Sequence, residues 1–593
     1  MRFPYGLADF ATLISEGYFY VDRTDRIPLV ENAGRQLLFL RPRRFGKSLW
    51  LSTLENYYDL AKAGDFERLF GGLKIGQNPT PLHNRYFVLK LNFSVVDPSG
   101  DRDAIRGALF NHINGSIEEF ALRYQTYLPT PIAIHEDALR SWRAMLAAVS
   151  QTPHKLYLLI DEYDNFANEV MISRERGKPR YQELVEGEGI IKTFFKAVKD
   201  GAEGRGVDRV FITGVSPVVL SDMTSGYNVA ETLSLWPRFN DLCGFTTEEL
   251  RDALTQVAEV YGFDAARGEE ALEVMRAFYN GYCFSLKSHV RVYNPTLALY
   301  FLKRFADDGE YPPRLLDDNL AMDRNRIHYV ARLPHGPTLV TQALAADADH
   351  PESAILIDQL ADRFGVEMML NTPKDQTFLA SLLYYFGVLT LAGRNDWGQL
   401  RLTIPNLVVR KLYVERLQEA LLPNYEDQEQ RQAAARYFYA NGELGPLCAL
   451  LEQRYFKVFD NRDLRWSNEL VVKTAFLVTL FNDTFYIMDS EPALDKGYGD
   501  LSLILRPDLR QYQLLDHLLE FKYVPLKTLG LSSEAVGAMD REALRALPAV
   551  AEQIKDAETQ LTRYRATLER VYGDKLKLRT HAVVCIGLQR LVW

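Results

Sequence analysis

Four short, largely apolar runs alternate with helical stretches between residues 36 and 214 of this 593-residue chain. The runs are QLLFL (36–40), YFVLKLNFS (86–94), LYLLI (156–160) and RVFITG (209–214). Strands that are apolar throughout are buried on both faces, and the intervening helices supply the long crossovers that parallel pairing needs. The pattern predicts an α/β domain with a parallel sheet, an architecture typical of nucleotide-binding proteins.

Length and charge limit the organisation of the chain and its partners. A chain of 593 residues is too long for one hydrophobic core, so several domains are expected. The formal net charge is −9, which argues against a generic polyanion binder. Any contact with nucleic acid must therefore come from a local basic surface or a metal-lined cleft.

The cysteines and the apolar runs indicate a cytoplasmic, soluble protein. The four cysteines are scattered and form no CxxC pair, which argues against a disulfide framework or a zinc site. The start, MRFPYGLADF, lacks the layout of a signal peptide. No apolar run approaches the roughly 18 residues of a membrane span, so we expect no membrane partner.

The stretch RPRRFGKSLW (41–50) contains the Gly46, Lys47 and Ser48 of a phosphate-binding loop, between a predicted strand and a predicted helix. In such a loop the lysine reaches the β and γ phosphates and the serine hydroxyl binds Mg²⁺. The usual Walker A pattern has a glycine where this chain has Arg41. On these residues alone, a solvated basic turn is an open alternative.

Asp161 and Glu162 directly follow the apolar run LYLLI, where a Walker B motif would lie. An acid at this position can hold Mg²⁺ through water, and its neighbour can polarise the attacking water. We assign Asp161 to the first role and Glu162 to the second. Thr213, at the end of the next run, is a candidate γ-phosphate sensor, and a threonine that only satisfies backbone groups is equally open.

The remaining chain suggests two more domains. Residues 246–450 are mainly helical, and Thr246 with Glu249 forms a predicted capping box. The order helix, strand, turn, strand over 375–406 suits a winged-helix-like unit or a helical spacer with one hairpin. Residues 451–593 show a further α/β pattern. The predicted domains are 1–245, 246–450 and 451–593.

A second set of polar residues lies in the C-terminal domain. Asp500 begins one apolar strand, and Glu520 and Lys522 share one face of the next. Two carboxylates and a lysine suit metal-dependent phosphodiester hydrolysis. E-x-K is common on exposed strands, but the neighbouring Leu518, Leu519 and Phe521 indicate a buried one.

Helical residues extend this second set. Gln560 and Tyr564 are four residues apart and share one face of the predicted helix over 549–571. Glu469, near the start of a helix over 468–481, is either a further metal ligand or a solvated glutamate.

Several N-terminal segments resemble the AAA-ATPase-like family, whose phosphate loop reads RPRRFGKS. They are PYGLADFATLISEGYFYVDRTDRI, LFLRPRRFGKSLWLSTLENYYD, LLIDEYDN, VFITGVSPV, LCGFTTEEL and YNGYCFS…RVYNPTLALYFL, spread over residues 3–305. The resemblance implies a P-loop NTPase fold, and Arg41 is the family's own variant. It also implies ATP-site roles for Lys47, Ser48, Asp161 and Glu162. For Arg43 and Arg44 it leaves phosphate contact, action across a subunit boundary and a plain surface role open.

Residues 451–593 resemble the PD-(D/E)XK restriction-like nuclease superfamily, in the branch with a Q-x-x-x-Y motif. Gly499 stands where that family has a proline. The resemblance implies that Asp500 and Glu520 bind metal and that Lys522 is catalytic. It implies that Gln560 and Tyr564 contact DNA or support the site.

Together these features predict an ATPase that gates or drives a Mg²⁺-dependent nuclease acting on DNA, with Mn²⁺ as a substitute ion at the nuclease site. RNA as substrate and assembly into a homo-oligomer are both open. The alternative is an ATP-dependent switch whose nuclease-like domain binds nucleic acid or a partner without cutting.

Overall fold

The computed structural model describes residues 1–97, 102–165, 178–217, 229–316, 336–345, 354–361, 375–422, 424–456, 469–489 and 500–593. Gly499 lies outside these ranges. The chain forms two compact units, each built from separate segments. Unit 1 comprises 1–264, 281–308 and 357–400, and unit 2 comprises 265–280, 309–356 and 401–593. The three consecutive domains expected from the sequence stay a prediction.

Unit 1 is built on a five-stranded parallel sheet in the order β2-β3-β4-β1-β5. Its strands are β1 (Gln36–Leu40), β2 (Tyr86–Asn92), β3 (Lys155–Asp161), β4 (Val207–Gly214) and β5 (Glu231–Thr232). The first four are the apolar runs of the sequence, so the predicted α/β architecture is confirmed for this region. Because the strands are parallel, the loops after β1, β3 and β4 leave the sheet at the same edge.

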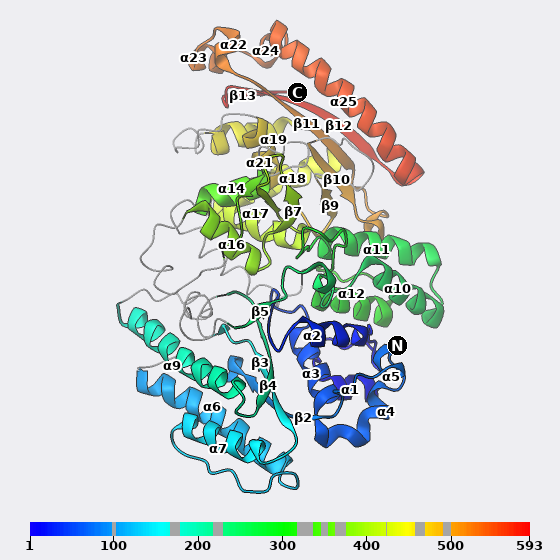
Figure 1. The fold of residues 1–593 in the computed structure, drawn as a ribbon. Coiled ribbons are helices and arrows are strands. Elements are labelled where there is room, and N and C mark those ends of the chain that lie inside the picture. The colour runs from blue at the N-terminus through cyan, green and yellow to red at the C-terminus, as the bar shows by residue number, and fades with distance from the viewer. Residues whose placement is uncertain are drawn as a thin grey trace. The chain divides into compact units, whose positions relative to one another are not determined.

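Helices cover both faces of this sheet (Figure 1). One layer contains α6 (Arg102–Arg123), α7 (Ala138–Ser150) and α9 (Lys178–Ala202). The other contains α1 (Phe10–Ser15), α2 (Ile27–Ala33), α3 (Lys47–Tyr58), α4 (Phe66–Phe70) and α5 (Lys74–Gln77). Burial between two helical layers explains why the strands are largely apolar, while the edge strand β2 still carries the polar Lys90 and Asn92.

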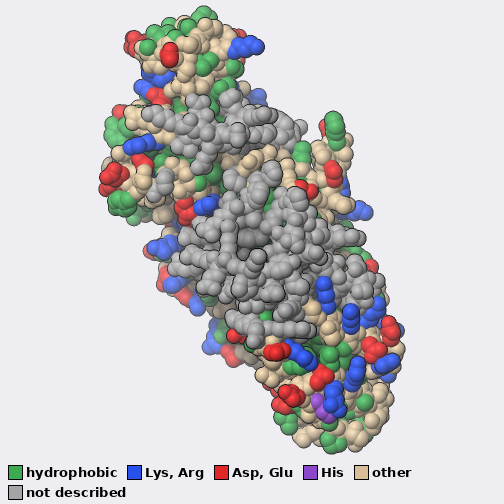
Figure 2. All heavy atoms as spheres, turned by 90° about the vertical axis from the view of Figure 1, so that its left-hand side faces the viewer, with side chains coloured by type: hydrophobic (Ala, Val, Ile, Leu, Met, Phe, Trp, Pro, Cys, Tyr) green, Lys and Arg blue, Asp and Glu red, His purple; other side chains and the backbone are tan. Residues whose placement is uncertain are grey.

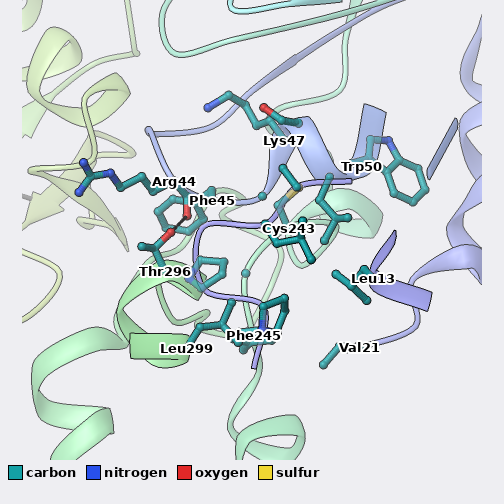
Figure 3. A pocket seen from close by; sticks show the side chains of 18 of the residues that line it. Leu13, Val21, Arg44, Phe45, Lys47, Trp50, Cys243, Phe245, Thr296 and Leu299 are labelled. Carbon is teal, nitrogen blue, oxygen red and sulfur yellow. Dashed lines mark hydrogen bonds between the residues drawn. The ribbon is translucent and has the colours of Figure 1, made fainter. Parts of the chain in front are cut away.

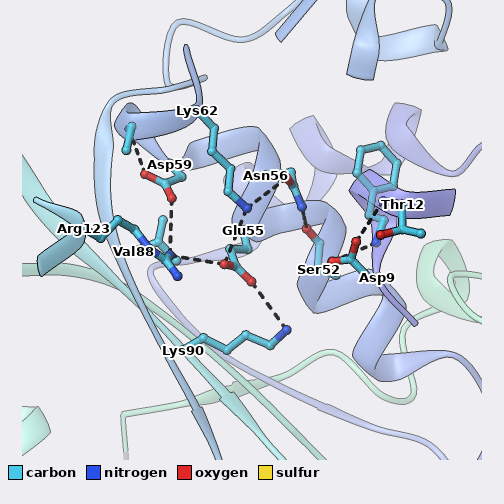
Figure 4. Close-up of polar contacts among 12 residues, drawn as sticks. Asp9, Thr12, Ser52, Glu55, Asn56, Asp59, Lys62, Val88, Lys90 and Arg123 are labelled. Atoms are coloured by element: carbon cyan, nitrogen blue, oxygen red, sulfur yellow. Dashed lines mark hydrogen bonds and ion pairs between the residues drawn. The ribbon is translucent and has the colours of Figure 1, made fainter. Parts of the chain in front are cut away.

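A polar network holds α3 against the edge strand β2 (Figure 4). The Glu55 carboxylate on α3 forms ion pairs with Lys62 at 3.6 Å, Lys90 on β2 at 3.5 Å and Arg123 on α6 at 3.3 Å. Asp59, at the end of α3, is buried and lies 3.5 Å from Arg123. The network ties three elements together at the end of α3 that lies away from the phosphate loop.

Further helices of unit 1 come from later in the chain. They are α10 (Thr247–Tyr261), α12 (Pro295–Asp308) and α16 (Gln376–Tyr385). The capping box predicted at Thr246 and Glu249 is confirmed, because each side chain accepts a hydrogen bond from the other's backbone N–H. The helix, strand, turn and strand expected over 375–406 are α16, β7 (Thr390–Arg394), a turn and β8 (Leu400–Thr403). Their relation to a winged-helix unit stays a prediction.

Unit 2 contains a second five-stranded sheet in the order β13-β12-β11-β10-β9. Its strands are β9 (Tyr486–Asp489), β10 (Leu501–Leu505), β11 (Asp516–Val524), β12 (Leu578–Ile586) and β13 (Arg590–Val592). Only β11 and β12 pair in parallel, and α25 (Pro548–Tyr572) connects them and packs along both strands (Figure 1). The helix α21 (Glu469–Leu480) contacts β11.

Smaller elements complete unit 2 and its boundary. The helices are α11 (Ala265–Tyr279), α14 (Gly336–Ala345), α17 (Leu407–Leu421), α18 (Tyr425–Asn441), α19 (Gly445–Leu450), α22 (Leu526–Leu529), α23 (Ser533–Ala538) and α24 (Arg541–Arg545). The short strand β6 covers Ile355–Ile357.

Basic and acidic side chains are interspersed on the lower part of the face in Figure 2, where α6 and α7 of unit 1 lie. Within the described ranges, no helix combines the length and apolarity needed to cross a bilayer.

Candidate functional site

The loop between β1 and α3 has the backbone shape of a phosphate cradle. Gly46 precedes the helix with φ of 88°, in the left-handed region that favours glycine, and Arg44 adopts φ of 66°. The helix begins at Lys47, so the first N–H groups of α3 lack helical partners and are directed toward the loop. An exposed helix N-terminus of this kind attracts anions.

Arg41 supports this loop from within the protein. Its side chain is buried, and its guanidinium lies over the rings of Phe39 at 4.4 Å and Phe284 at 4.0 Å. It donates hydrogen bonds of 2.7–2.9 Å to the main-chain carbonyls of Leu40, Ser234 and Phe239. Burial lowers the pKa of Arg41 to about 10. The residue that replaces the usual glycine therefore links the phosphate loop to the segment that follows β5.

Lys47 is held over the loop by neutral acceptors. Its Nζ donates to the carbonyl oxygens of Arg41 and Pro42, each at 3.0 Å. The side chain is buried, and burial lowers the pKa of Lys47, against the opposing effect of Asp161 and Glu162. An ammonium group bound only to carbonyls can exchange them for phosphate oxygens without breaking a short ion pair.

The structure brings Ser48, Asp161 and Thr213 together at the carboxyl edge of the sheet. Ser48 Oγ donates to Asp161 Oδ2 at 2.6 Å, and Thr213 Oγ1 donates to Asp161 Oδ1 at 2.5 Å. Thr213 lies on β4, between β3, which ends at Asp161, and β1, which leads into the loop before Ser48 on α3. The hydroxyl of Thr213 thus orients the carboxylate that sequence reasoning assigned to Mg²⁺.

Glu162 follows β3 with φ of 50°, a conformation that strains a residue with a side chain. Its side chain lines a cavity together with Lys47. Burial raises the pKa of the Glu162 carboxyl, while Lys47 and Arg43 act in the opposite direction. A carboxylate with a raised pKa is a stronger base, as the predicted role in polarising water requires.

Asp164 was not singled out in the sequence. Its buried carboxylate accepts hydrogen bonds from the backbone N–H of Val215 at 3.1 Å and of Ser216 at 2.7 Å, and from Ser216 Oγ at 2.9 Å. It thereby joins the ends of β3 and β4. Nearby, Arg43 donates to Asn165 Oδ1 at 3.0 Å, which places Arg43 beside the same loop.

A cavity of about 280 Å³ opens beside the phosphate loop (Figure 3). Loop residues 44–50 form one wall, and the other walls come from segments 4–8, 19–23, 242–245 and 295–299. Its lining is largely apolar and includes Val21, Trp50, Phe245 and Leu299. Thr296 Oγ1 donates to the carbonyl of Arg44 at 3.1 Å, which fixes the loop against α12.

An ion pair closes one side of this cavity. The guanidinium of Arg23 pairs with Glu249 and donates to the carbonyl of Gly244 at 2.8 Å. Glu249 also closes the capping box of α10. Sequence reasoning missed this wall because its segments are more than 200 residues apart in the chain.

In unit 2, Asp500 and Glu520 lie next to one another. Asp500 Oδ2 accepts a hydrogen bond from the backbone N–H of Phe521 at 2.8 Å, and the backbone N–H of Asp500 donates to Glu520 Oε2 at 3.3 Å. Glu520 is buried, and burial, followed by the repulsion of Asp500, raises its pKa to about 7. Two carboxylates forced together in this way favour a shared cation.

Lys522 and Gln560 join the carboxylate pair. Lys522 Nζ donates to Glu520 Oε1 at 2.8 Å and to Gln560 Oε1 at 3.2 Å, and lies 3.8 Å from Glu469 Oε1. Tyr564 packs instead against an apolar cluster that includes Leu561. The geometry thus groups Glu469, Lys522 and Gln560 with the carboxylates, while the Tyr564 ring lies in the apolar layer.

The donor set is suited to a hard divalent ion but is not a complete cage. Among the residues that the structure describes, no three His, Cys, Asp or Glu side chains are grouped closely enough to hold a metal ion. Mg²⁺ is commonly held by one or two carboxylates and several waters, so Asp500 and Glu520 fit this ion.

Comparison with known proteins concerns mainly unit 1. Residues 4–224 match the model of the predicted AAA-ATPase family. The N-terminal region is therefore AAA-ATPase-like in sequence, and its five-stranded parallel sheet is consistent with a P-loop NTPase fold.

Two individual proteins are similar to parts of this chain. An uncharacterized protein in the vnfD 5′ region of Azotobacter chroococcum mcd 1 is 30% identical over 307 residues, which are 51% of this chain and 52% of that protein. This chain thus spans about half the length of the curated relative it matches. The structure of the Aeropyrum pernix ORC1 protein in complex with DNA aligns with 68% of this chain and 94% of its own chain, at 12% identity. The TM-score of this alignment is 0.23, which is too low to indicate a shared fold.

Proposed function

We propose that this protein binds and hydrolyses ATP in unit 1, and that unit 2 is a Mg²⁺-dependent DNA phosphodiesterase whose activity the ATPase gates or drives. The observation that carries the ATPase assignment is the hydrogen bond between Ser48 and Asp161, beside the phosphate loop. The family match over residues 4–224 supports the same assignment.

The residues of unit 1 divide the work on ATP. The backbone N–H groups at the start of α3 and the ammonium of Lys47 bind the phosphate oxygens. Ser48 and Asp161 hold Mg²⁺, which when bound offsets the negative charge of the phosphates. Thr213 keeps the Asp161 carboxylate in place, and Glu162 accepts a hydrogen bond from the attacking water.

The apolar cavity receives the nucleotide base. It opens directly beside Gly46 and Lys47, and Val21, Phe245 and Leu299 offer flat or branched apolar walls. Pockets with an apolar lining and a few polar groups are typical of cofactor sites.

In unit 2, Asp500 and Glu520 hold the catalytic metal, which when bound activates water for attack on the phosphodiester. The Lys522 ammonium orients that water by donating a hydrogen bond to it, and Gln560 positions the ammonium. DNA as the substrate rests on the resemblance to nucleases with the Q-x-x-x-Y motif.

The test measures both activities of the full chain. Phosphate release from ATP and cleavage of linear and circular DNA are followed with Mg²⁺ or Mn²⁺, with and without ATP. Lys47→Ala should abolish ATP hydrolysis, and Lys522→Ala should abolish DNA cleavage. Lys196→Ala on α9 and Lys555→Ala on α25 remove exposed lysines and should leave both activities unchanged. DNA that stays intact under every condition contradicts the nuclease assignment.

A second candidate is an ATP-dependent switch with a non-cutting unit 2. The net charge of −9 favours it, because a nuclease gains from an attractive field for DNA. This alternative requires that the protein binds ATP without hydrolysing it. It also requires that Asp500→Ala leaves the ATP-dependent binding of nucleic acid or a partner unaltered.

A further inference from the structure

The carboxylate pair of unit 2 has a second lysine partner, which is more deeply buried than Lys522. Lys473 lies on α21, its side chain is 7% exposed, and its Nζ is 3.8 Å from Asp500 Oδ1. Glu469 lies one helical turn before it and faces Lys522 at 3.8 Å. Each strand carboxylate therefore has its own ammonium partner, Lys473 for Asp500 and Lys522 for Glu520.

The side chains of this cluster are buried or partly buried, with exposed fractions between 5% and 30%, so their net charge matters for what the site can bind. A charged side chain taken out of water costs several kcal/mol unless charges of opposite sign surround it. With Glu520 ionised, as a bound cation requires, the described side chains Glu469, Asp500 and Glu520 contribute three negative charges, and Lys473 and Lys522 contribute two positive ones. One Mg²⁺ and one phosphodiester group bring this total of −1 to zero, whereas a second Mg²⁺ leaves an excess of two positive charges.

We propose that Lys473 is a positioning residue that takes the place of a second cation, so that the site binds a single divalent ion at Asp500 and Glu520. This inference rests on the proposed nuclease function and specifies its metal stoichiometry. The Lys473 ammonium holds the Oδ1 side of Asp500, while the backbone N–H of Phe521 holds Oδ2. The carboxylate is thus fixed before the ion arrives.

The experiment counts bound Mn²⁺ by electron paramagnetic resonance on the full chain without nucleotide. The wild type should bind one ion that Asp500→Asn removes. Lys473→Met keeps the length and apolar stem of the side chain but removes its charge, and it should add a second Asp500-dependent ion. Lys473→Arg restores the charge and should return the count to one.

Each outcome has a distinct meaning. Two Asp500-dependent ions in the wild type, or one ion in Lys473→Met, overturns the inference and leaves the metal-dependent function standing. A wild type without any Asp500-dependent ion overturns both. If Lys473→Met fails to fold, as judged by its circular dichroism spectrum, the decision passes to the wild-type count and to Lys473→Gln.

Discussion

The phosphate loop of unit 1 contains a buried lysine and the carboxylate pair of unit 2 a partly buried one, but the partners of the two lysines differ. Lys47 is bound by the neutral carbonyls of Arg41 and Pro42, whereas Lys522 is bound by the Glu520 carboxylate. The first arrangement keeps an ammonium group available to an incoming anion. The second cancels part of a negative charge and leaves the remainder for a cation. Residue type alone does not distinguish these roles.

The largest expected effect separates the two lysines. Lys47→Met should reduce ATP hydrolysis by at least about 100-fold, because the phosphates lose their main charged partner, and Lys522→Met should reduce DNA cleavage similarly. Phosphate release measures the first activity, and DNA cleavage with and without ATP measures the second. If Lys522→Met also suppresses phosphate release, the sites do not act as the separate centres described here.

A second prediction concerns a histidine pair of unit 2, in which His517 is buried and His581 is half-buried. His517 Nδ1 and His581 Nε2 are 3.2 Å apart beside Phe438. Burial lowers the pKa of His517 to about 3 and that of His581 to about 4, and the positive Arg579 acts in the same direction. Both rings are therefore neutral in the folded protein at pH values where unfolded histidine is already charged.

Because both histidine pKa values are lowered by folding, unit 2 should become less stable as the pH falls. The contribution of the neutral histidine pair to the unfolding free energy is fully present above the ordinary histidine pKa of 6.5. It is lost as the pH falls from 6.5 toward 4, because over this range the histidines of the unfolded chain take up protons more readily than those of the folded chain. We expect unit 2 to lose about 5 to 6 kcal/mol of unfolding free energy over this interval, about half of it from each ring. Urea unfolding at several pH values measures it. A slope unchanged in His581→Gln would contradict the assignment.

A third prediction restores the usual glycine of the phosphate loop. Arg41→Gly should destabilise unit 1 by about 2 to 3 kcal/mol, because the carbonyls of Leu40, Ser234 and Phe239 lose a charged donor. Thermal and urea unfolding test this, with Arg41→Lys as a partial rescue. Unchanged stability together with weaker ATP binding would instead make Arg41 a phosphate ligand.

The smallest effect separates backbone strain from ligand contact. Gly46 and Gly530 have φ of 88° and 64°, and a Cβ at either meets no atom within 4 Å. Alanine at each position should cost about 1 kcal/mol of stability. Only Gly46→Ala should weaken ATP binding, as measured by calorimetry. Equal ATP affinities in the two variants would show that the left-handed turn is not part of the cradle.

Local sequence patterns predicted the parts of the fold that depend on local causes. The runs at β1, β2, β3 and β4 are apolar because both faces of the sheet are covered, and the capping box at Thr246 needs only its own helix. The strands β5 and β13 were missed, because two or three residues carry no periodicity. Strand alternation correctly placed Glu520 and Lys522 on one face, since this depends only on pleating.

The rest of the candidate sites depends on contacts between distant segments. Three such contacts join residues from different elements. They are the hydrogen bonds of Arg41, the Arg23–Glu249 pair and the ion pair of Lys473 with Asp500. No local pattern marks them. Thr213 shows the same limit, because its position at a strand end was clear but its hydrogen bond to Asp161 required the strand order.

The interleaved course of the chain restricts how this protein can be divided. The chain passes from one unit to the other near residues 264, 280, 308, 356 and 400. Phe284 and Thr296, which support Arg41 and the carbonyl of Arg44, belong to a returning segment of unit 1. An N-terminal fragment ending at residue 245 would lack them, so the AAA-ATPase-like region cannot be exchanged between proteins as a simple cassette without also transplanting these later segments.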